Sequence, residues 1–67
     1  MNTVYKVIEI IGTSEKSWED AANSAIKTAS KTLKEIRVAE VKDMDINIDG
    51  GKMTYRIKLR VSFKFVA

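Results

Sequence analysis

The stretch that most constrains the fold is residues 52–65, where polar and apolar residues alternate without exception. Every odd position from Met53 to Phe65 is apolar or aromatic, and every even position from Lys52 to Lys64 is polar or charged. Successive side chains of a β-strand point to opposite faces, so this pattern predicts a strand with one apolar and one basic face. The apolar face is expected to lie against the core, which leaves the basic face as the place to look for function.

The chain is short for a domain that folds alone. Its 67 residues are expected to form a single domain over 1–67, and a chain of this size buries only about 60% of the surface that its unfolded form exposes. It contains no cysteine, so neither disulfides nor thiolate metal sites can add stability. Homo-oligomerisation is therefore expected.

Composition argues against several classes of function. No apolar run approaches the ~20 residues of a membrane span and no leader opens the chain, so a cytoplasmic protein without membrane contact is expected. The net charge is only +3, and the two signs are interspersed, which argues against nucleic-acid binding. Without cysteine, histidine or a glycine-rich phosphate loop, the chain is predicted not to be an enzyme.

The first half of the chain predicts a strand and then a helix. Residues 4–11 are rich in β-branched residues and predict a strand that ends at Gly12. Thr13 and Ser14 are expected to cap a helix at about 15–34, and Trp18 falls on its apolar stripe as a core residue. Four alanines in this helix would let it sit close to a sheet: Ala21, Ala22, Ala25 and Ala29.

A second strand over 38–48 shows a slip in its alternation. Val41 is apolar at an odd position, whereas Met44 and Ile46 are apolar at even ones. A one-residue β-bulge near residues 42–43 would bring both sets to the same face. The pair Gly50-Gly51 then predicts a tight hairpin turn into the last strand, because glycine tolerates positive φ.

Counting outwards from this turn gives a register for the two strands. It places three pairs of opposite charge on one face, Asp45 with Arg56, Asp43 with Lys58 and Glu40 with Arg60, and further pairs Asn47 with Thr54 and Val38 with Ser62. The chain is thus predicted to be of the α+β class, with β-α-β-β topology and one helix on one face. The three-stranded antiparallel sheet would have the strand order 1-3-2.

The chain resembles a known family, the dodecins, from about Val4 to Phe65. The similarity lies in the order and spacing of short pieces along the sequence: Val4-Tyr5-Lys6, Gly12-Thr13-Ser14, Lys31-Thr32-Leu33, Glu40-Val41, Thr54-Tyr55 and Val61-Ser62-Phe63. This resemblance implies a homo-oligomer, a hollow dodecamer, that binds flavins such as riboflavin or FMN in pairs between subunits. The implied role is storage or photoprotection rather than catalysis.

Two positions depart from the flavin-binding pattern. Flavin-binding dodecins carry a tryptophan that stacks on the flavin where this chain has Val38, and a glutamine that hydrogen-bonds the ring where it has Arg56. Stacking of a ring on an aromatic side chain contributes roughly 1–3 kcal/mol, and valine has no π face. Flavin binding at Val38 and Arg56 is therefore expected to be weakened or lost.

The chain looks more like the dodecins described as calcium-binding, which lack that tryptophan. Its candidate ligands are Asp43, Asp45 and Asn47, which alternate along the second strand and carry the hard oxygens that calcium prefers. An EF-hand is rejected because Ile48 replaces the required glycine. Cross-strand pairing of Asp43 and Asp45 with lysine and arginine is the competing interpretation. A functional flavin-storing dodecin and a basic nucleotide-binding module remain as alternative functions.

Overall fold

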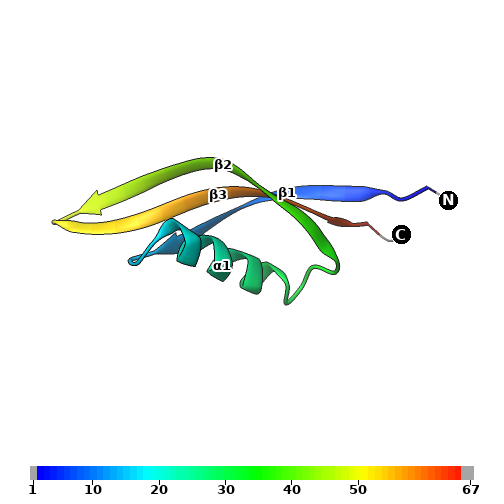
Figure 1. The fold of residues 1–67 in the computed structure, drawn as a ribbon, viewed down its shortest axis with the longest axis horizontal. Helices are drawn as coiled ribbons and strands as arrows, with labels where there is room; N and C mark the ends of the chain where they lie inside the picture. Colours follow the sequence, from blue (N-terminus) through cyan, green and yellow to red (C-terminus); the bar gives the residue numbers. More distant parts are fainter. Residues whose placement is uncertain (1, 66–67) are drawn as a thin grey trace.

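Strand β3 lies at the centre of a three-stranded sheet. The computed structural model describes residues 2–65, with the elements β1 (Tyr5–Ser14), α1 (Trp18–Ala29), β2 (Ile36–Asp49) and β3 (Lys52–Lys64). The sheet order is β1-β3-β2, and β3 is antiparallel to both neighbours. Helix α1 lies along one face of the sheet (Figure 1). The predicted fold class, topology and strand order are confirmed.

The alternation along β3 separates the two faces of the sheet as predicted. Ile57, Leu59 and Val61 are buried beneath the helix, whereas Arg56 and Arg60 on the opposite face are exposed. The buried set is completed by Ala21 and Ala25 of α1. The core is therefore small, and two of its five members are alanines.

Gly12 allows the helix to pack closely against β1. The prediction that the strand ends at this glycine is wrong. A Cβ at this position would collide with the carbonyl oxygen of Ala21 and would lie 2.9 Å from the Cβ of Ala25. Strand β1 continues through Gly12 to Ser14. The glycine is therefore needed for close approach of two backbones, which is a common use of this residue within strands.

The helix is shorter than predicted and its cap is a different serine. Ser17 is the N-cap, and its hydroxyl accepts a hydrogen bond from the backbone N–H of Asp20 at 3.0 Å. Ser14 instead organises the preceding turn, accepting from the N–H of Lys16 at 2.9 Å and donating to the Asp20 carboxylate at 2.6 Å. The helix ends at Ala29 rather than near 34, and the chain continues in turns, where the N–H of Lys31 bonds to the carbonyl of Thr28 at 3.2 Å. Glu35, whose φ is 53°, then leads into β2.

The register of β2 on β3 agrees with the count from the glycine turn at every pair that was predicted. Gly50 and Gly51 have φ values of 57° and 81°, as the tight turn requires. The expected bulge is present between Val41 and Asp43, and a second irregularity, not predicted, lies between Ile36 and Val38. The bulges keep Val41 and Met44 on the helix side of the sheet, opposite Leu59 and Ile57.

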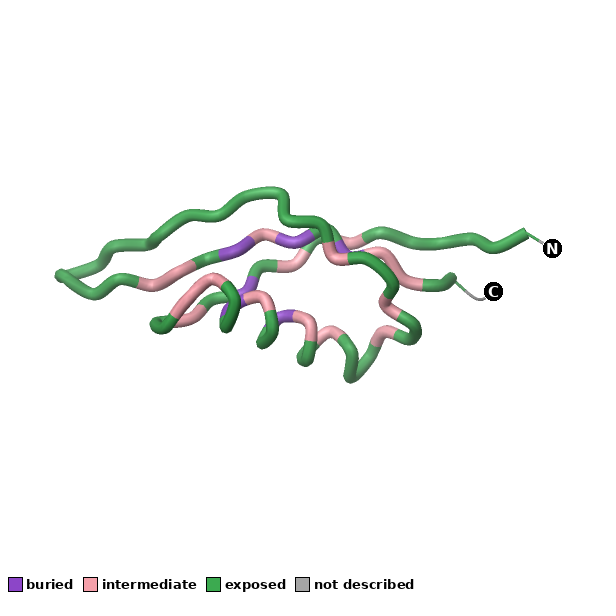
Figure 2. Tube along the Cα trace, viewed as in Figure 1, coloured by how far each residue is buried: buried purple, intermediate pink, exposed green. Residues whose placement is uncertain are grey.

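The chain is more open than a folded monomer of its size. Its radius of gyration is 13.8 Å, against about 11 Å for a compact domain of this length. Its accessible surface is 5170 Å², about 900 Å² more than the size scaling gives for a 7.6 kDa monomer. Figure 2 shows buried positions only in the middle of the sheet and helix, with exposed backbone at both ends.

Within residues 2–65, no helix has the length and apolar character needed to cross a membrane.

Candidate functional site

The sheet face opposite α1 carries rows of polar and charged side chains, each row running across all three strands. The pairing places Thr13, Arg56 and Asp45 in one row and Ile11, Lys58 and Asp43 in the next. The following row holds Glu9, Arg60 and Glu40. No element of the described chain covers this open face, so its side chains are available to a ligand or to another molecule.

Arg56 and Asp45 form the best-defined polar contact on the open face. The guanidinium group donates two hydrogen bonds to the Asp45 carboxylate, from Nε to Oδ1 at 2.7 Å and from Nη2 to Oδ2 at 2.9 Å. This hydrogen bonding lowers the pKa of Asp45 below its usual value and raises that of Arg56. Both carboxylate oxygens of Asp45 are therefore engaged by a cation on the neighbouring strand.

Only one of the three predicted charge pairs forms an ion pair. Arg60 lies opposite Glu40 as predicted, but its guanidinium contacts Glu9 of β1, with Nη2 and Oε2 3.1 Å apart. Asp43 lies opposite Lys58, yet no ion pair within residues 2–65 involves either of them. A central strand has acids available on both sides, so register alone did not decide which one Arg60 contacts.

Asp43, Asp45 and Arg56 come together around a pocket on this face. The pocket has a volume of about 290 Å³ and is also lined by Lys58, Ile11 and Met44. It thus combines two carboxylates and two cations with the apolar side chain of Ile11, whereas the side chain of Met44 belongs to the helix side of the sheet, opposite Ile57. Asn47 is one row further towards the hairpin, opposite Thr54, and is not part of the lining.

Val38 shares this face but lies far from Arg56 along the sheet. Its partner on β3 is Ser62, six residues from Arg56, which corresponds to about 20 Å in an extended strand. The side chain of Val38 is 59% exposed. On the other side of Ser62 lies Val7 of β1, which is also exposed. A ligand the size of one flavin ring cannot touch Val38 and Arg56 of the same chain.

The candidate metal ligands do not form a metal site within one chain. Among the described residues, no three or more acidic, histidine or cysteine side chains are grouped closely enough to hold an ion. Asp43, Asp45 and Asn47 occupy successive rows, and side chains two residues apart on one strand face are separated by about 7 Å. Calcium takes six to eight oxygens, so a single copy of this face supplies too few.

Trp18 supports the site from the helix side of the sheet. It is half-buried against the core, as predicted, and its ring meets Tyr55 edge-on with 5.0 Å between the ring centres. Its indole N–H donates to the backbone carbonyl of Asp45 at 3.3 Å. The tryptophan therefore holds β2 in place next to the Arg56–Asp45 pair and is not itself on the open face.

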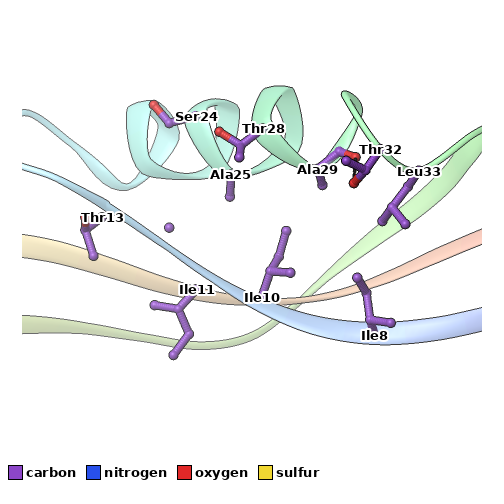
Figure 3. A pocket seen from close by; sticks show the side chains of 11 residues that line it. Ile8, Ile10, Ile11, Thr13, Ser24, Ala25, Thr28, Ala29, Thr32 and Leu33 are labelled. Carbon is purple, nitrogen blue, oxygen red and sulfur yellow. Dashed lines mark hydrogen bonds between the residues drawn. The ribbon is translucent and has the colours of Figure 1, made fainter.

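A second pocket, of about 490 Å³, lies between α1 and β1. Figure 3 shows Ile10 pointing from the strand towards Ala25 and Ala29 of the helix, while Ile11 points away from the helix. Ser24, Thr28, Thr32 and Thr13 are among the lining residues, and none of the lining residues is charged. This pocket has no group that would attract an ion.

The contribution of β1 to the open face was missing from the sequence-based prediction. Ile11 lines the polar pocket with 57% of its surface exposed, and Glu9 pairs with Arg60. No short turn links β1 to β3, so their register could not be counted from the sequence. The sequence did carry one sign that β1 contributes to both faces of the sheet. The run from Val7 to Ile11 is apolar on both strand faces except at Glu9.

These features define a β-α-β-β protein in which one sheet face packs on a helix and the other is open and charged. The chain belongs to the dodecin family, whose model, described as Dodecin, matches residues 4–66. The resemblance proposed from the sequence is thereby confirmed.

Two relatives and one solved structure illustrate the similarity. The chain is 57% identical to the calcium dodecin of Mycobacterium tuberculosis over 63 residues, covering 92% of this chain and 89% of that protein. It is 38% identical to the dodecin of Thermus thermophilus over 65 residues, covering 96% and 94%. A crystal structure of the M. tuberculosis calcium dodecin, described as calcium-chelating, superposes with a TM-score of 0.89 at 56% identity, covering 94% and 91%.

Proposed function

We propose that this chain is a non-catalytic, single-domain subunit of a homo-oligomer that binds a small ligand at contacts between copies, with calcium preferred over flavin. The observation that carries the proposal is the bidentate Arg56–Asp45 pair. By the resemblance, Arg56 corresponds to a glutamine of the flavin-binding members, and its guanidinium is already paired with a carboxylate. The similarity to a calcium dodecin supports the same choice of ligand.

The need for several copies follows from what one chain offers. Of the three candidate ligands, Asp45 is bonded to Arg56 and Asn47 lies outside the pocket lining. Asp43 is the carboxylate that no ion pair in residues 2–65 engages. A symmetry axis near the pocket would gather copies of Asp43 and complete a coordination shell. The dodecamer and the cytoplasmic location implied by the sequence stay predictions.

The test is calcium titration by calorimetry of the purified assembly, with its native mass measured in the same buffer. Calcium is expected to bind the wild type, and Asp43→Asn is expected to lose that binding. Glu40→Gln is the matched control, because it also neutralises one exposed carboxylate of β2 but lies outside the pocket lining. Equal loss in both variants, or no calcium binding by an intact wild-type assembly, would contradict the proposal.

Flavin binding is the second candidate, supported by the similarity to a protein named simply dodecin. Its signature is a yellow protein that quenches the fluorescence of added riboflavin. If this is observed with the wild type while calcium has no effect, the preference for calcium is wrong and the family's flavin-binding role applies.

A further inference from the structure

Lys58 is the one cation of β3 that no carboxylate of the described chain neutralises. The other four basic side chains of the strand each have an ion-pair partner within residues 2–65: Lys52 with Glu15, Arg56 with Asp45, Arg60 with Glu9 and Lys64 with Glu35. Lys58 has no such partner in this part of the chain, although Asp43 lies directly opposite it on β2. The sheet thus places two opposite charges side by side without joining them.

Lys58 is also less exposed than the other basic residues of its strand. It is half-buried, whereas the remaining cations of β3 are all exposed. An exposed cation needs no partner because water solvates it, but a half-buried one has lost part of its contact with water. A counter-ion from outside the chain is therefore expected beside Lys58.

The polar pocket of the open face places Lys58 beside further hydrogen-bond donors. Its lining also contains Arg56, Asp43 and Asp45, and its volume is about 290 Å³. Asp45 uses two N–H donors of the Arg56 guanidinium, a group that carries further donors. The pocket therefore offers an ammonium group together with spare guanidinium donors. These are the groups with which proteins bind phosphate and other oxyanions.

The charges of this pocket sum to zero. Asp43 and Asp45 contribute two negative charges, and Arg56 and Lys58 contribute two positive ones. Gathering several copies around one axis multiplies both signs equally, so each added Asp43 carboxylate brings a Lys58 ammonium with it. A divalent cation bound at Asp43 is therefore repelled by Lys58 in every copy.

We propose that Lys58 and the spare donors of Arg56 form an oxyanion subsite next to Asp43, so that calcium binds together with an anion of the phosphate class. The anion neutralises Lys58 and supplies oxygens to the coordination shell, which Asp43 alone does not fill. Each ligand improves the site for the other, so the two bind cooperatively and the coupling is the same in both directions. The subsite rests on the proposed function, since it takes the anion that accompanies calcium.

The first experiment measures calcium binding to the purified assembly with and without inorganic phosphate. Calorimetric titrations at micromolar calcium are compared with titrations in chloride of the same ionic strength. Phosphate is expected to raise the affinity for calcium by roughly tenfold, within the range usual for coupled ligands, and calcium should raise the affinity for phosphate by the same factor. Equal calcium affinities in phosphate and chloride would overturn the subsite and leave the proposed calcium binding intact.

Lys58→Met removes the charge and is expected to abolish the effect of phosphate. Without phosphate this variant should bind calcium at least as tightly as the wild type, since the repelling ammonium group is gone. Lys58→Arg keeps the charge and should retain the phosphate effect, which separates loss of charge from a general disturbance of the fold. A phosphate effect that survives in Lys58→Met would overturn the assignment.

The matched control is Lys52→Met. It removes a cation from the same strand and the same sheet face, at a position outside the pocket lining. Lys52 is six residues from Lys58, about 20 Å along an extended strand. The control is therefore expected to show the same phosphate effect as the wild type, and loss of the effect in both lysine variants would overturn the role of Lys58.

Phosphate binding without calcium distinguishes a failed subsite from a failed proposed function. Broadening of the phosphorus NMR signal of inorganic phosphate is measured with the assembly in the presence of a calcium chelator. Broadening is expected with the wild type and with Lys52→Met, but not with Lys58→Met. If calcium binds in neither buffer, the proposed function is contradicted and this measurement decides the subsite by itself. The expected pattern would then support an oxyanion subsite that works without calcium, and no broadening with the wild type would overturn it.

Discussion

Two residues on the open sheet face underlie the proposed preference for calcium over flavin. The guanidinium of Arg56 donates two hydrogen bonds to the carboxylate of Asp45. Val38 presents a small aliphatic side chain at an exposed position. By the resemblance to flavin-binding dodecins, the first is expected to remove a neutral hydrogen-bonding group and the second a stacking surface. Both changes act on the ligand through chemistry that can be tested one residue at a time.

Restoring the aromatic ring is expected to restore flavin binding in part. In Val38→Trp with Arg56→Gln, riboflavin should bind roughly 5- to 150-fold more tightly than in the wild type, which corresponds to about 1–3 kcal/mol of stacking. Quenching of riboflavin fluorescence gives the affinity. Val38→Leu with Arg56→Gln is the matched control, since leucine adds apolar volume without a π face. Equal tightening in that control would show that stacking is not the cause.

The Arg56–Asp45 pair also predicts a pH dependence of stability. The pKa of Asp45 is lower in the folded chain than in the unfolded one, so the contribution of the pair is present above the unfolded value, about 3.9. It is lost as the pH falls through the lower folded pKa. Urea unfolding between neutral and acidic pH is expected to show a steeper loss of stability for wild type than for Asp45→Asn. Parallel curves for the two proteins would contradict this.

At the scale of elements, the helix is fixed by its contact with β1 and the hairpin by its turn and bulges. Gly12 brings α1 against the sheet, and Ser17 caps its first turn. The bulge after Val41 keeps Met44 on the same face of the sheet as Val41. A few residues thus set the face of the sheet and the position of the helix. Replacing one of them is expected to change the free energy of unfolding in a predictable direction.

Adding one methyl group at Gly12 is expected to push the helix away from the sheet. In Gly12→Ala the new Cβ meets the Ala21 carbonyl and the Ala25 side chain, and such overpacking typically costs about 1–3 kcal/mol. The loss is measured as the change in the free energy of unfolding in urea. Asn23→Ala, at an exposed position of the same helix, should change it by less than about 0.5 kcal/mol. A Gly12→Ala protein as stable as the wild type would show that the backbone contact is not tight.

Within residues 2–65 the molecule has a core of five buried apolar residues and an extended shape. In the proposed homo-oligomer, neighbouring copies would cover apolar surface that a single chain leaves in water. Assembly and folding are therefore expected to be coupled.

This coupling predicts that stability depends on protein concentration. The midpoint of thermal unfolding should rise when the wild-type concentration is increased a hundredfold, because association stabilises the folded chain by mass action. Circular dichroism at several concentrations measures the effect. A variant that no longer assembles should show a midpoint independent of concentration. A concentration-independent midpoint for the wild type would mean that single chains are stable without partners.

The sequence alone determined the strand order, both faces of β3 and the register of β2 on β3. These follow from local causes: a strand's side chains alternate, and a tight turn fixes which residues lie opposite one another. The alternation of 52–65, the two glycines before it and the slip in alternation near 42–43 were therefore enough to place Val38, Asp43, Asp45 and Arg56 on one face.

Only the tertiary structure decided which of these residues meet. The contact of Arg60 with Glu9, the place of Ile11 in the pocket and the exposure of Ile48 all depend on where β1 and α1 lie. These elements join the sheet through packing between residues far apart in the sequence. Periodicity shows that a face is apolar, but only the position of the helix shows how much of that face remains uncovered.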